Sequence, residues 1–562
     1  MKLFQKDSIF QCIVFLFITF VVLATYHGVF FTFFQQDEWQ NYGHHLLKGA
    51  GVLFDTDRGQ NLLKLFFAEG RVLSEVMYLL LYGISRFSVV PIFIFSIFVQ
   101  VINSYLVFIL GKNISKSLFF GIIASLFFAV NSVSSQAVTW AAAVGTLPAA
   151  TFLLFSLLLY VEYLEGGNTR KRNFSYFLGI LSLFFKETGL FIFVLYPLLY
   201  LLWGKVKKIQ DIFLVHAPLL LYGIALVLFR MYELLSAPKS AAGFVGPDSG
   251  GFILPMLYHS IVNPMISLIQ MFIPPLDIYA FIPTIVRSEY RMLVGSPMFD
   301  LVGQSAVTDV VSLAGSMIVL FILGGMLLAE KNENYAKKTL TFGLLLFWLS
   351  FLPYAVLHKE FSYMSSRYYY VGAIGAAIVF GYLVDWFLCR VHFIGKSFIF
   401  GLVGIFLVHQ MQSIQNDIRP QIVLANERKN YLNEIKRVHP KLENKTIFYI
   451  TSDKKFLGEI TYPFQNGLGY ILEVQYYNTG KIPRSFLATD FLWDLGSEGF
   501  RDENGSIFGY FEHLDLIGAA VKEGKISPQI VYSYIYNSKT HTMSDISLSV
   551  REQLATLSGS LQ

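Results

Sequence analysis

The chain has 562 residues, of which 54% are hydrophobic and only 14% are charged. A soluble domain averages roughly 25% charged residues, so this composition excludes an ordinary soluble protein and predicts a polytopic membrane protein. The net charge of +5 is small, and the basic residues form short clusters between apolar segments. That pattern favours an orientation signal over a surface for nucleic acid. With only Cys12 and Cys389, the sequence offers neither a disulfide framework nor a zinc site.

The first apolar segment, residues 9–34, follows Lys2 and Lys6. It is too long for the core of a signal peptide, which has about 7–15 apolar residues, and no small-residue cleavage site follows it. We therefore expect a retained membrane helix.

Further apolar segments of about 20 residues predict membrane spans along most of the chain. The expected spans number about 11: 9–34, 89–110, 117–131, 138–161, 173–186, 189–203, 211–231, 308–329, 338–357, 368–389 and 395–414. Among them, 117–131, 173–186 and 189–203 are short, which predicts broken or half-length helices. The fold class is therefore mainly α, a polytopic membrane helix bundle.

The charge of the loops predicts the orientation. The apolar segment 72–85 is assigned to the membrane interface or to a re-entrant excursion. If it does not cross the membrane, the basic clusters fall on one side together with the N-terminus, as the positive-inside rule requires. These clusters are Lys112/Lys116, Arg170–Arg172, Lys205/Lys207/Lys208, Lys331/Lys337/Lys338 and Arg390/Lys396. We expect a multi-pass integral membrane protein, in the cell membrane if bacterial, with a cytoplasmic N-terminus and extracytoplasmic loops 35–88 and 232–307.

The composition changes after residue 415, where charged residues become more frequent. We expect a membrane domain over 1–415 and a small extracytoplasmic α/β domain over 416–562, long enough for one core. A helix over 426–437 and strands at 446–450 and 530–535 are predicted within it.

Two other segments carry weaker signals. The apolar stretch 252–273 is expected to lie in the membrane interface, and the polar tail 544–562 is expected to be partly disordered.

Asp37 and Glu38 follow the first span directly, where a charge is costly and easily avoided. Adjacent side chains on a helix diverge by about 100°, so the two carboxylates are not expected to act on one atom. One of them can serve as a general base while the other positions a helix end, a substrate hydroxyl or a divalent cation. The alternative is a structural one, with Asp37 as a helix N-cap and Trp39 as an interfacial anchor.

Lys186 and Glu187 interrupt the apolar stretch 174–202, which predicts two short helices that meet at the outer membrane face. A buried ammonium at that place can bind a phosphate. The alternative is a helical hairpin turn in which Lys186 and Glu187 pair with each other.

Arg367 opens a span among tyrosines, where a guanidinium can bind phosphate oxygens in a bidentate manner. Its alternative role is that of an interfacial arginine in an aromatic belt. Arg71 can act similarly, or it can form an ordinary surface ion pair with Glu69 or Glu75. His358, in the segment before Arg367, is a candidate for a supporting role.

Neighbouring His44 and His45 are interpreted as polar loop residues in preference to metal ligands, because no spacing in the chain matches a strong metal motif. The sequence therefore requires no cofactor, although a divalent cation is compatible with the acidic pair.

Together these residues indicate a reaction type. Transfer of a sugar from a phosphate requires a base to deprotonate the acceptor hydroxyl. It also requires cations that neutralise the charge on the departing phosphate. Carboxylates, lysine and arginines beside lipid predict transfer from a lipid-phosphate donor.

Several short segments also carry a family resemblance. They are Asp37-Glu38, Gly70-Arg71-Val72-Leu73, Gln100-Val101-Ile102-Asn103, Gln136-Ala137-Val138-Thr139-Trp140, Phe185-Lys186-Glu187-Thr188-Gly189 and Ser366-Arg367-Tyr368-Tyr369-Tyr370. In their order, over roughly residues 10–390, the chain resembles the GT-C superfamily of polyprenyl- or dolichyl-phosphate-sugar glycosyltransferases. The nearest pattern is that of protein O-mannosyltransferases and the tetratricopeptide-repeat-containing transmembrane O-mannosyltransferases.

The resemblance implies roles for the site residues. Asp37 would be the general base or a base-assisting carboxylate, and Glu38 its neighbour in contact with the acceptor or a cation. Lys186, Arg367 and Arg71 would hold the donor phosphate. Apart from the resemblance, Glu187 is, like His358, a candidate for a supporting role.

The chain also departs from the family pattern. Val72 replaces the proline after the family's arginine, and Gln136 and Ser366 replace glutamates. No tetratricopeptide repeats follow, so the family's sugar and acceptor do not carry over.

The resulting prediction is a membrane glycosyltransferase that moves a sugar from a polyprenyl-phosphate carrier to a protein, glycan or lipid acceptor on the extracytoplasmic face. One alternative is a transporter or flippase of lipid-linked glycans, although the internal repeats common in such proteins are not found in the sequence. Another is a structural or sensory membrane protein whose C-terminal domain is the working part.

Overall fold

The structure is a computed structural model of the whole chain. The residues that it describes are 2–35, 37–49, 71–85, 87–205, 208–236, 253–280, 297–329, 334–355, 366–453, 471–472, 474–476, 498–503 and 505–559.

The chain forms two compact units. The helical unit consists of Met1–His27, Gln60–Ser74 and Ile94–Gln415, and the mixed unit consists of Gly28–Gly59, Glu75–Phe93 and Asn416–Gln562. The mixed unit thus combines the C-terminal part of the chain with segments from either side of residues 60–74.

Seven helical segments in the described part of the chain are long and apolar enough to cross a membrane. They are Ile9–Phe31 (in α1, Lys2–Tyr26, and η1, His27–Phe31), Val90–Ser115 (α5), Ala141–Gly166 (mainly α8, Thr146–Gly166), Ile209–Phe229 (in α11, Ile209–Ser236), Thr308–Ala329 (in α15, Pro297–Ala329), Ser366–Arg390 (mainly α17, Tyr370–Arg390) and Phe393–Val438 (α18). The prediction of a mainly helical, multi-pass membrane protein is confirmed at this level.

The remaining expected spans correspond to shorter helices. These are α6 (Leu118–Ala129), α9 (Thr169–Leu183), α10 (Ile192–Leu202) and α16 (Asn334–Leu349). Each expected span therefore lies on a helix, and the total number that crosses the bilayer stays a prediction.

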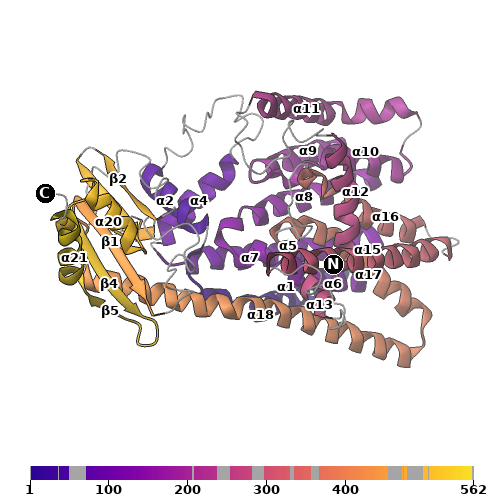
Figure 1. The fold of residues 1–562 in the computed structure, drawn as a ribbon. Coiled ribbons are helices and arrows are strands. Elements are labelled where there is room, and N and C mark those ends of the chain that lie inside the picture. The colour runs from indigo at the N-terminus through magenta and orange to yellow at the C-terminus, as the bar shows by residue number, and fades with distance from the viewer. Residues whose placement is uncertain are drawn as a thin grey trace. The chain divides into compact units, whose positions relative to one another are not determined.

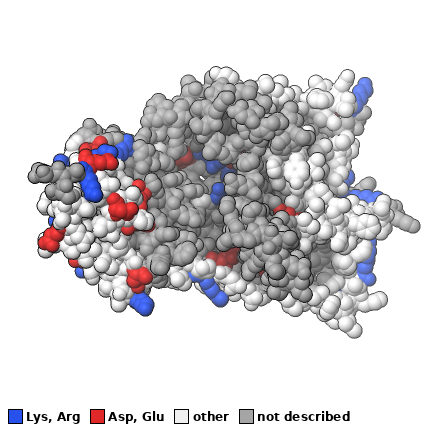
Figure 2. Space-filling view, in the orientation of Figure 1, with Lys and Arg blue, Asp and Glu red and all other residues white. Residues whose placement is uncertain are grey.

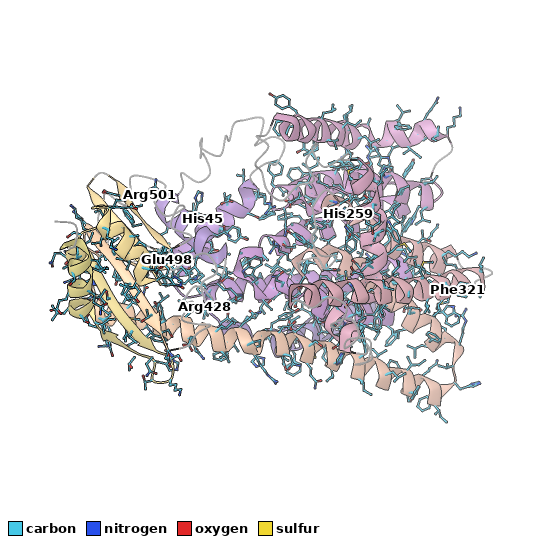
Figure 3. All side chains as sticks on the ribbon, viewed as in Figure 1. His45, His259, Phe321, Arg428, Glu498 and Arg501 are labelled. Carbon is cyan, nitrogen blue, oxygen red and sulfur yellow. The ribbon has the colours of Figure 1, made fainter. Side chains whose placement is uncertain are left out.

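The helical unit has central helices that are largely buried and peripheral helices with an apolar, exposed surface. In α8 and α17, 72% of the most apolar window is buried, compared with 22% in α11 and α15. Phe321 on α15 is 84% exposed and lies at the surface in Figure 3. Most of the described surface of this unit in Figure 2 is neither acidic nor basic. An apolar exterior of this kind fits a lipid environment.

The turn between α8 and α9 follows from two residues. Gly167 adopts a left-handed conformation with φ 73° and donates its N–H to Tyr163 O at 2.7 Å, which ends α8. Asn168 then caps α9, because its side chain accepts a hydrogen bond from Arg170 N at 3.0 Å.

Helices α16 and α17 pack closely where both carry glycine. A Cβ atom at Gly375 would lie 2.4 Å from Phe347 N and 2.7 Å from Gly343 O. Only a residue without a side chain lets these two backbones approach so closely.

Polar side chains join the central helices from within. Asn103 on α5 donates to Leu147 O and to the Tyr370 hydroxyl, both at 3.0 Å, and it accepts from Thr151 Oγ1 at 2.6 Å. Asn103 is fully buried, so these bonds satisfy a group that would otherwise be costly in this interior.

The connection between α6 and α8 is a series of short helices: η4 (Ser132–Ser134), α7 (Gln136–Thr139) and η5 (Ala141–Ala143). Asn131 accepts from Ser134 N at 3.2 Å and donates to Met271 O at 2.8 Å, just beyond α12 (Ile253–Gln270). Gln410 accepts from Ser132 N at 3.0 Å. These bonds fix the connection, which carries Gln136 and Trp140. The other short helices of this unit are η6 (Glu187–Gly189), α13 (Pro275–Ala280), η7 (Leu352–Tyr354) and η8 (Ser366–Tyr369).

Helix α18 is much longer than the expected span 395–414. It runs without interruption over Phe393–Val438 and includes the separately predicted helix 426–437. At 1.5 Å per residue, 46 residues extend about 69 Å, more than twice the roughly 30 Å of a bilayer core. The segment after Gln415 belongs to the mixed unit, with α2 (Asp37–Lys48) and most of α4 (Val72–Ser85).

A five-stranded sheet forms the centre of the C-terminal domain, in the order β2-β3-β1-β4-β5. The strands are β1 (Lys445–Ser452), β2 (Gly499–Glu503), β3 (Ser506–Phe511), β4 (Val531–Asn537) and β5 (Thr542–Asp545). Strand β1 pairs in parallel with β3 and β4, while β2 and β5 add antiparallel edges. The predicted strands near 446–450 and 530–535 and the small α/β domain are confirmed.

Alternate residues of the sheet face different layers. Ile447 belongs to a core with Ile517 of α20 (Leu514–Lys522) and Leu554 of α21 (Ser547–Gly559). These two helices cover the same face of the sheet in Figure 1. Phe448, the next residue of β1, contacts His439, which follows α18. The central strand β1 therefore has buried residues on both faces.

The expectation of a partly disordered tail was wrong for its described part. Residues 542–545 form β5, and α21 follows directly. Leu554 and Val550 of α21 are buried in the core, so the polar composition of this segment reflects its exposed face.

Candidate anion-binding site

The structure brings together Arg71, Lys186, Glu187 and Arg367, all in the helical unit. Arg71 precedes α4, Lys186 and Glu187 lie between α9 and α10, and Arg367 lies in η8 before α17. Charges of Arg71, Glu187 and Arg367 all act on Lys186. Residues separated by almost 300 positions thus form one cluster.

Lys186 lies in the short segment between α9 and η6. Its side chain is buried, with 6% of the residue exposed. The ammonium donates one hydrogen bond, to Thr146 Oγ1 at 2.7 Å, and lies 5.6 Å from the centre of the Tyr368 ring. It forms no ion pair with any residue that the structure describes. An ammonium has three N–H donors, so Lys186 retains donors for a ligand.

Burial lowers the pKa of Lys186 to about 7. Glu187 acts in the opposite direction, while Arg71 and Arg367 add to the lowering. Since desolvation disfavours the charged form, an anion bound beside Lys186 would restore its proton.

Glu187 is held by Arg71 and not by its neighbour Lys186. Arg71 Nε and Nη2 donate to the two carboxylate oxygens of Glu187 at 2.9 and 2.8 Å. Burial works to raise the pKa of Glu187, but Arg71 and Lys186 outweigh it and keep that pKa below its usual value. The expected pairing within the lysine–glutamate dipeptide is therefore not observed, because Glu187 pairs with Arg71. Glu69, one of the two partners considered for Arg71, lies outside the described residues.

The backbone at Arg71 is strained, with φ of 51° in the left-handed region. The following residues hold it in place, because Leu73 N donates to Phe184 O at 3.1 Å and Ser74 Oγ donates to Phe185 O at 2.6 Å. The beginning of α4 is thereby fixed to the segment that carries Lys186.

Arg367 contacts two aromatic rings. Its guanidinium carbon lies 4.5 Å from the centre of the Trp140 ring and 4.9 Å from that of Tyr368. Its backbone N donates to Gln136 Oε1 at 3.3 Å, and its Nη2 donates to the Tyr368 hydroxyl at 3.2 Å. Most of its guanidinium donors remain available, because guanidinium has five N–H groups.

Sequence reasoning missed Tyr354 and gave Trp140 no role. Tyr354 is in η7, and its ring lies 4.6 Å from that of Tyr368. The Tyr354 hydroxyl and Trp140 Nε1 are buried without a hydrogen-bond partner among the described residues. Trp140 stood within a family-like segment, but Tyr354 had no sequence signal, since its proximity to Arg367 arises only from folding.

Asp37 and Glu38 belong to the mixed unit, in the first turn of α2. The side chain of Asp37 is outside the described residues. Glu38 is 1% exposed, and its Oε2 accepts from Gln35 N at 2.7 Å. Glu38 also acts electrostatically on Arg428 of α18 in the same unit, which Figure 3 labels. Glu38 therefore stabilises the start of α2, in the manner of a capping box.

Two interpretations of the neighbouring residues were wrong. Trp39 is not an interfacial anchor, because it is fully buried and donates from Nε1 to Phe34 O at 3.1 Å. His44 and His45 lie on α2 and are buried, and His45 Nε2 lies 2.8 Å from Glu75 Oε2. An amphipathic helix packed on one face explains their burial.

His358 lies outside the described residues. Within the described ranges, no group of three or more His, Cys, Asp or Glu side chains is arranged to hold a metal ion. The cluster of Lys186, Arg367 and the Arg71–Glu187 pair carries an excess of positive charge, so the ligand class that it suits is an anion.

Neither the known protein families nor the curated proteins contain a match to this chain.

Proposed function

We propose that the protein is a membrane glycosyltransferase that takes a sugar from a polyprenyl-phosphate-linked donor. The donor phosphate would bind at Lys186 and Arg367, beside the Arg71–Glu187 pair. The acceptor would be a protein, glycan or lipid on the extracytoplasmic face. The resemblance of several ordered segments to GT-C enzymes suggests the reaction class.

The observation that carries the proposal is the burial of the Lys186 ammonium without an ion pair to any described residue. A buried ammonium with one neutral hydrogen-bond partner and no ion pair among the described residues is destabilising unless something else compensates it. A phosphate oxygen would provide a charge-assisted hydrogen bond. The site lies in a unit with many apolar helices, which suits a donor with a lipid tail.

Each residue has a specific role in this proposal. Lys186 and Arg367 would stabilise the negative charge that develops on the departing phosphate. Glu187 would position Arg71 through the bidentate ion pair. Asp37 remains the proposed base that deprotonates the acceptor hydroxyl, and a single in-line displacement would invert the configuration at the sugar.

Binding of a lipid phosphodiester by the full-length protein in nanodiscs tests the phosphate site. We expect Lys186→Met and Arg367→Gln each to weaken the binding of a polyprenyl-phosphate-linked hexose at least tenfold, since a charge-assisted hydrogen bond contributes about 1.5–3 kcal/mol. Arg390→Gln is the matched control. Arg390 also stacks on a tryptophan, Trp386 at 3.9 Å, but lies about 35 Å along α17 from Arg367.

Transfer itself is tested with Asp37→Asn, which should abolish release of the polyprenyl phosphate while donor binding persists. Near-normal transfer by this variant would show that Asp37 is not the base. Wild-type affinity in both cation variants would reject the phosphate site.

A further inference from the structure

Trp140 Nε1 and the Tyr354 hydroxyl, which lie near Arg367 and Tyr368, are buried hydrogen-bond donors that have no acceptor among the described residues. Trp140 is 5% exposed and Tyr354 is 2% exposed, so bulk solvent does not reach these donors. A buried donor without a partner costs about 1–3 kcal/mol, and native structures contain few of them. Two such donors in one place therefore call for a functional explanation.

Both donors belong to side chains that adjoin the cation cluster. The Trp140 ring lies 4.5 Å from the Arg367 guanidinium carbon. The Tyr354 ring lies 4.6 Å from the Tyr368 ring, which in turn lies 5.6 Å from Lys186 Nζ. The unpaired donors are thus part of the surroundings of the proposed phosphate site.

The charged and uncharged hydrogen-bond donors of the site suit different ligand oxygens. A phosphodiester has two non-bridging oxygens, and the unused N–H groups of Lys186 and Arg367 are sufficient to bind both. Charged donors form the stronger bonds to anionic oxygens. The uncharged donors of Trp140 and Tyr354 then suit uncharged oxygens, such as the hydroxyl and ring oxygens of a sugar.

We propose that Trp140 Nε1 and the Tyr354 hydroxyl bind oxygens of the sugar that the phosphate carries. This inference rests on the proposed function and extends it from the phosphate to the sugar. The site would then distinguish the loaded carrier from the bare lipid phosphate, because only the loaded carrier supplies acceptors for both donors. Release of the carrier after transfer would be favoured for the same reason.

A binding experiment with two ligands separates these contacts from the phosphate contacts. The probes are a short-chain polyprenyl phosphate and the same lipid carrying mannose, glucose or galactose through a phosphodiester. The wild-type protein should prefer at least one loaded lipid over the bare phosphate. We expect Trp140→Phe and Tyr354→Phe each to lower the affinity for that loaded lipid about tenfold. The affinity for the bare lipid phosphate should stay unchanged.

Two controls accompany these variants. Trp386→Phe removes another indole N–H that has no partner among the described residues, but at the opposite end of α17, and it should change neither affinity. Lys186→Met should lower the affinity for both the loaded and the bare lipid. Unchanged affinities in this variant would reject the proposed function and not only this inference.

Three outcomes would overturn the inference while the phosphate site stands. In the first, neither variant changes the affinity for the loaded lipid. In the second, both variants lower the affinity for loaded and bare lipid equally. In the third, the wild-type protein shows no preference for any loaded lipid. The last comparison needs no substitution, so it decides the matter even if a variant fails to fold.

Discussion

At the scale of single residues, the site is built from groups that are unfavourable for stability. Lys186 is buried without an ion pair to any described residue, and Arg71 has a strained backbone. Trp140 and Tyr354 keep unpaired donors. Unsatisfied polar groups and strain of this kind are typical of functional sites, where a ligand completes the interactions.

The first prediction concerns the stability of Lys186→Met. The pKa of Lys186 is lowered to about 7, so burial of its charged form destabilises the fold fully below pH 7 and progressively less as the pH rises toward 10.5. We expect the variant to be more stable than the wild type at pH 6.5 by about 1–4 kcal/mol, measured by thermal unfolding in one detergent. The gain should shrink at pH 9.5.

Lys171→Met is the control for this prediction. Lys171 pairs with Glu162 at 2.7 Å, but both side chains are 40% or more exposed, so its loss should have little effect. A Lys186→Met protein less stable than the wild type would contradict the expectation.

The second prediction concerns pH. An anion binds best while Lys186 is protonated, so affinity for a lipid phosphodiester should be constant below pH 7 and fall above it, by up to about tenfold per pH unit. A phosphodiester keeps its single charge over this range, so the effect reports on the protein. Lys186→Arg should remove the pH dependence, because an arginine stays protonated. A flat profile for the wild type between pH 6 and 9 would argue against a role for this ammonium.

At the scale of elements, close helix packing determines where the site residues lie. Helix α17 begins directly after η8, which carries Arg367, and Gly375 lets α17 pack closely against α16. The short connection between α6 and α8 places Trp140 against Arg367, and Asn131 and Gln410 fix that connection. The position of Arg367 therefore depends on contacts on both sides.

Gly375→Ala tests this packing. Its Cβ would meet the backbone of α16 at 2.4 Å, so the helices must separate, and we expect a loss of about 1–3 kcal/mol in stability. Gly401→Ala in α18 is the control, since a Cβ there meets nothing within 4 Å, and it should be neutral or slightly stabilising. Equal thermal midpoints for the two variants would show that the close approach is not required.

At the scale of the whole molecule, the charges of the loops predict the orientation in the membrane. The positive-inside pattern predicts that the turn between α8 and α9 is cytoplasmic and that the C-terminal domain is extracytoplasmic. Gly166 at the end of α8 and Ser527 in the domain are both exposed, so both suit labelling.

Cysteine labelling checks the orientation after Cys12 and Cys389 are replaced by serine. In intact cells, a membrane-impermeant maleimide should label Ser527→Cys, and it should label Gly166→Cys only after permeabilisation. The reverse pattern would invert the topology and remove the proposed site from the extracytoplasmic face.

The sequence alone determined the membrane class, the positions of the apolar helices and the α/β character of the C-terminal domain. These follow from local composition and periodicity, which the bilayer and the pleated sheet impose on each segment separately. Segment 72–85, for example, was expected as a separate apolar element and is helix α4 with the same bounds.

Only the tertiary structure decided which charged side chains meet. It paired Arg71 with Glu187, left Lys186 with a single neutral partner among the described residues, and brought Trp140 and Tyr354 to the site. It also buried Trp39 and gave Glu38 a helix-capping bond. Such contacts join positions far apart in the chain, and no local pattern encodes them, because each depends on how whole helices pack.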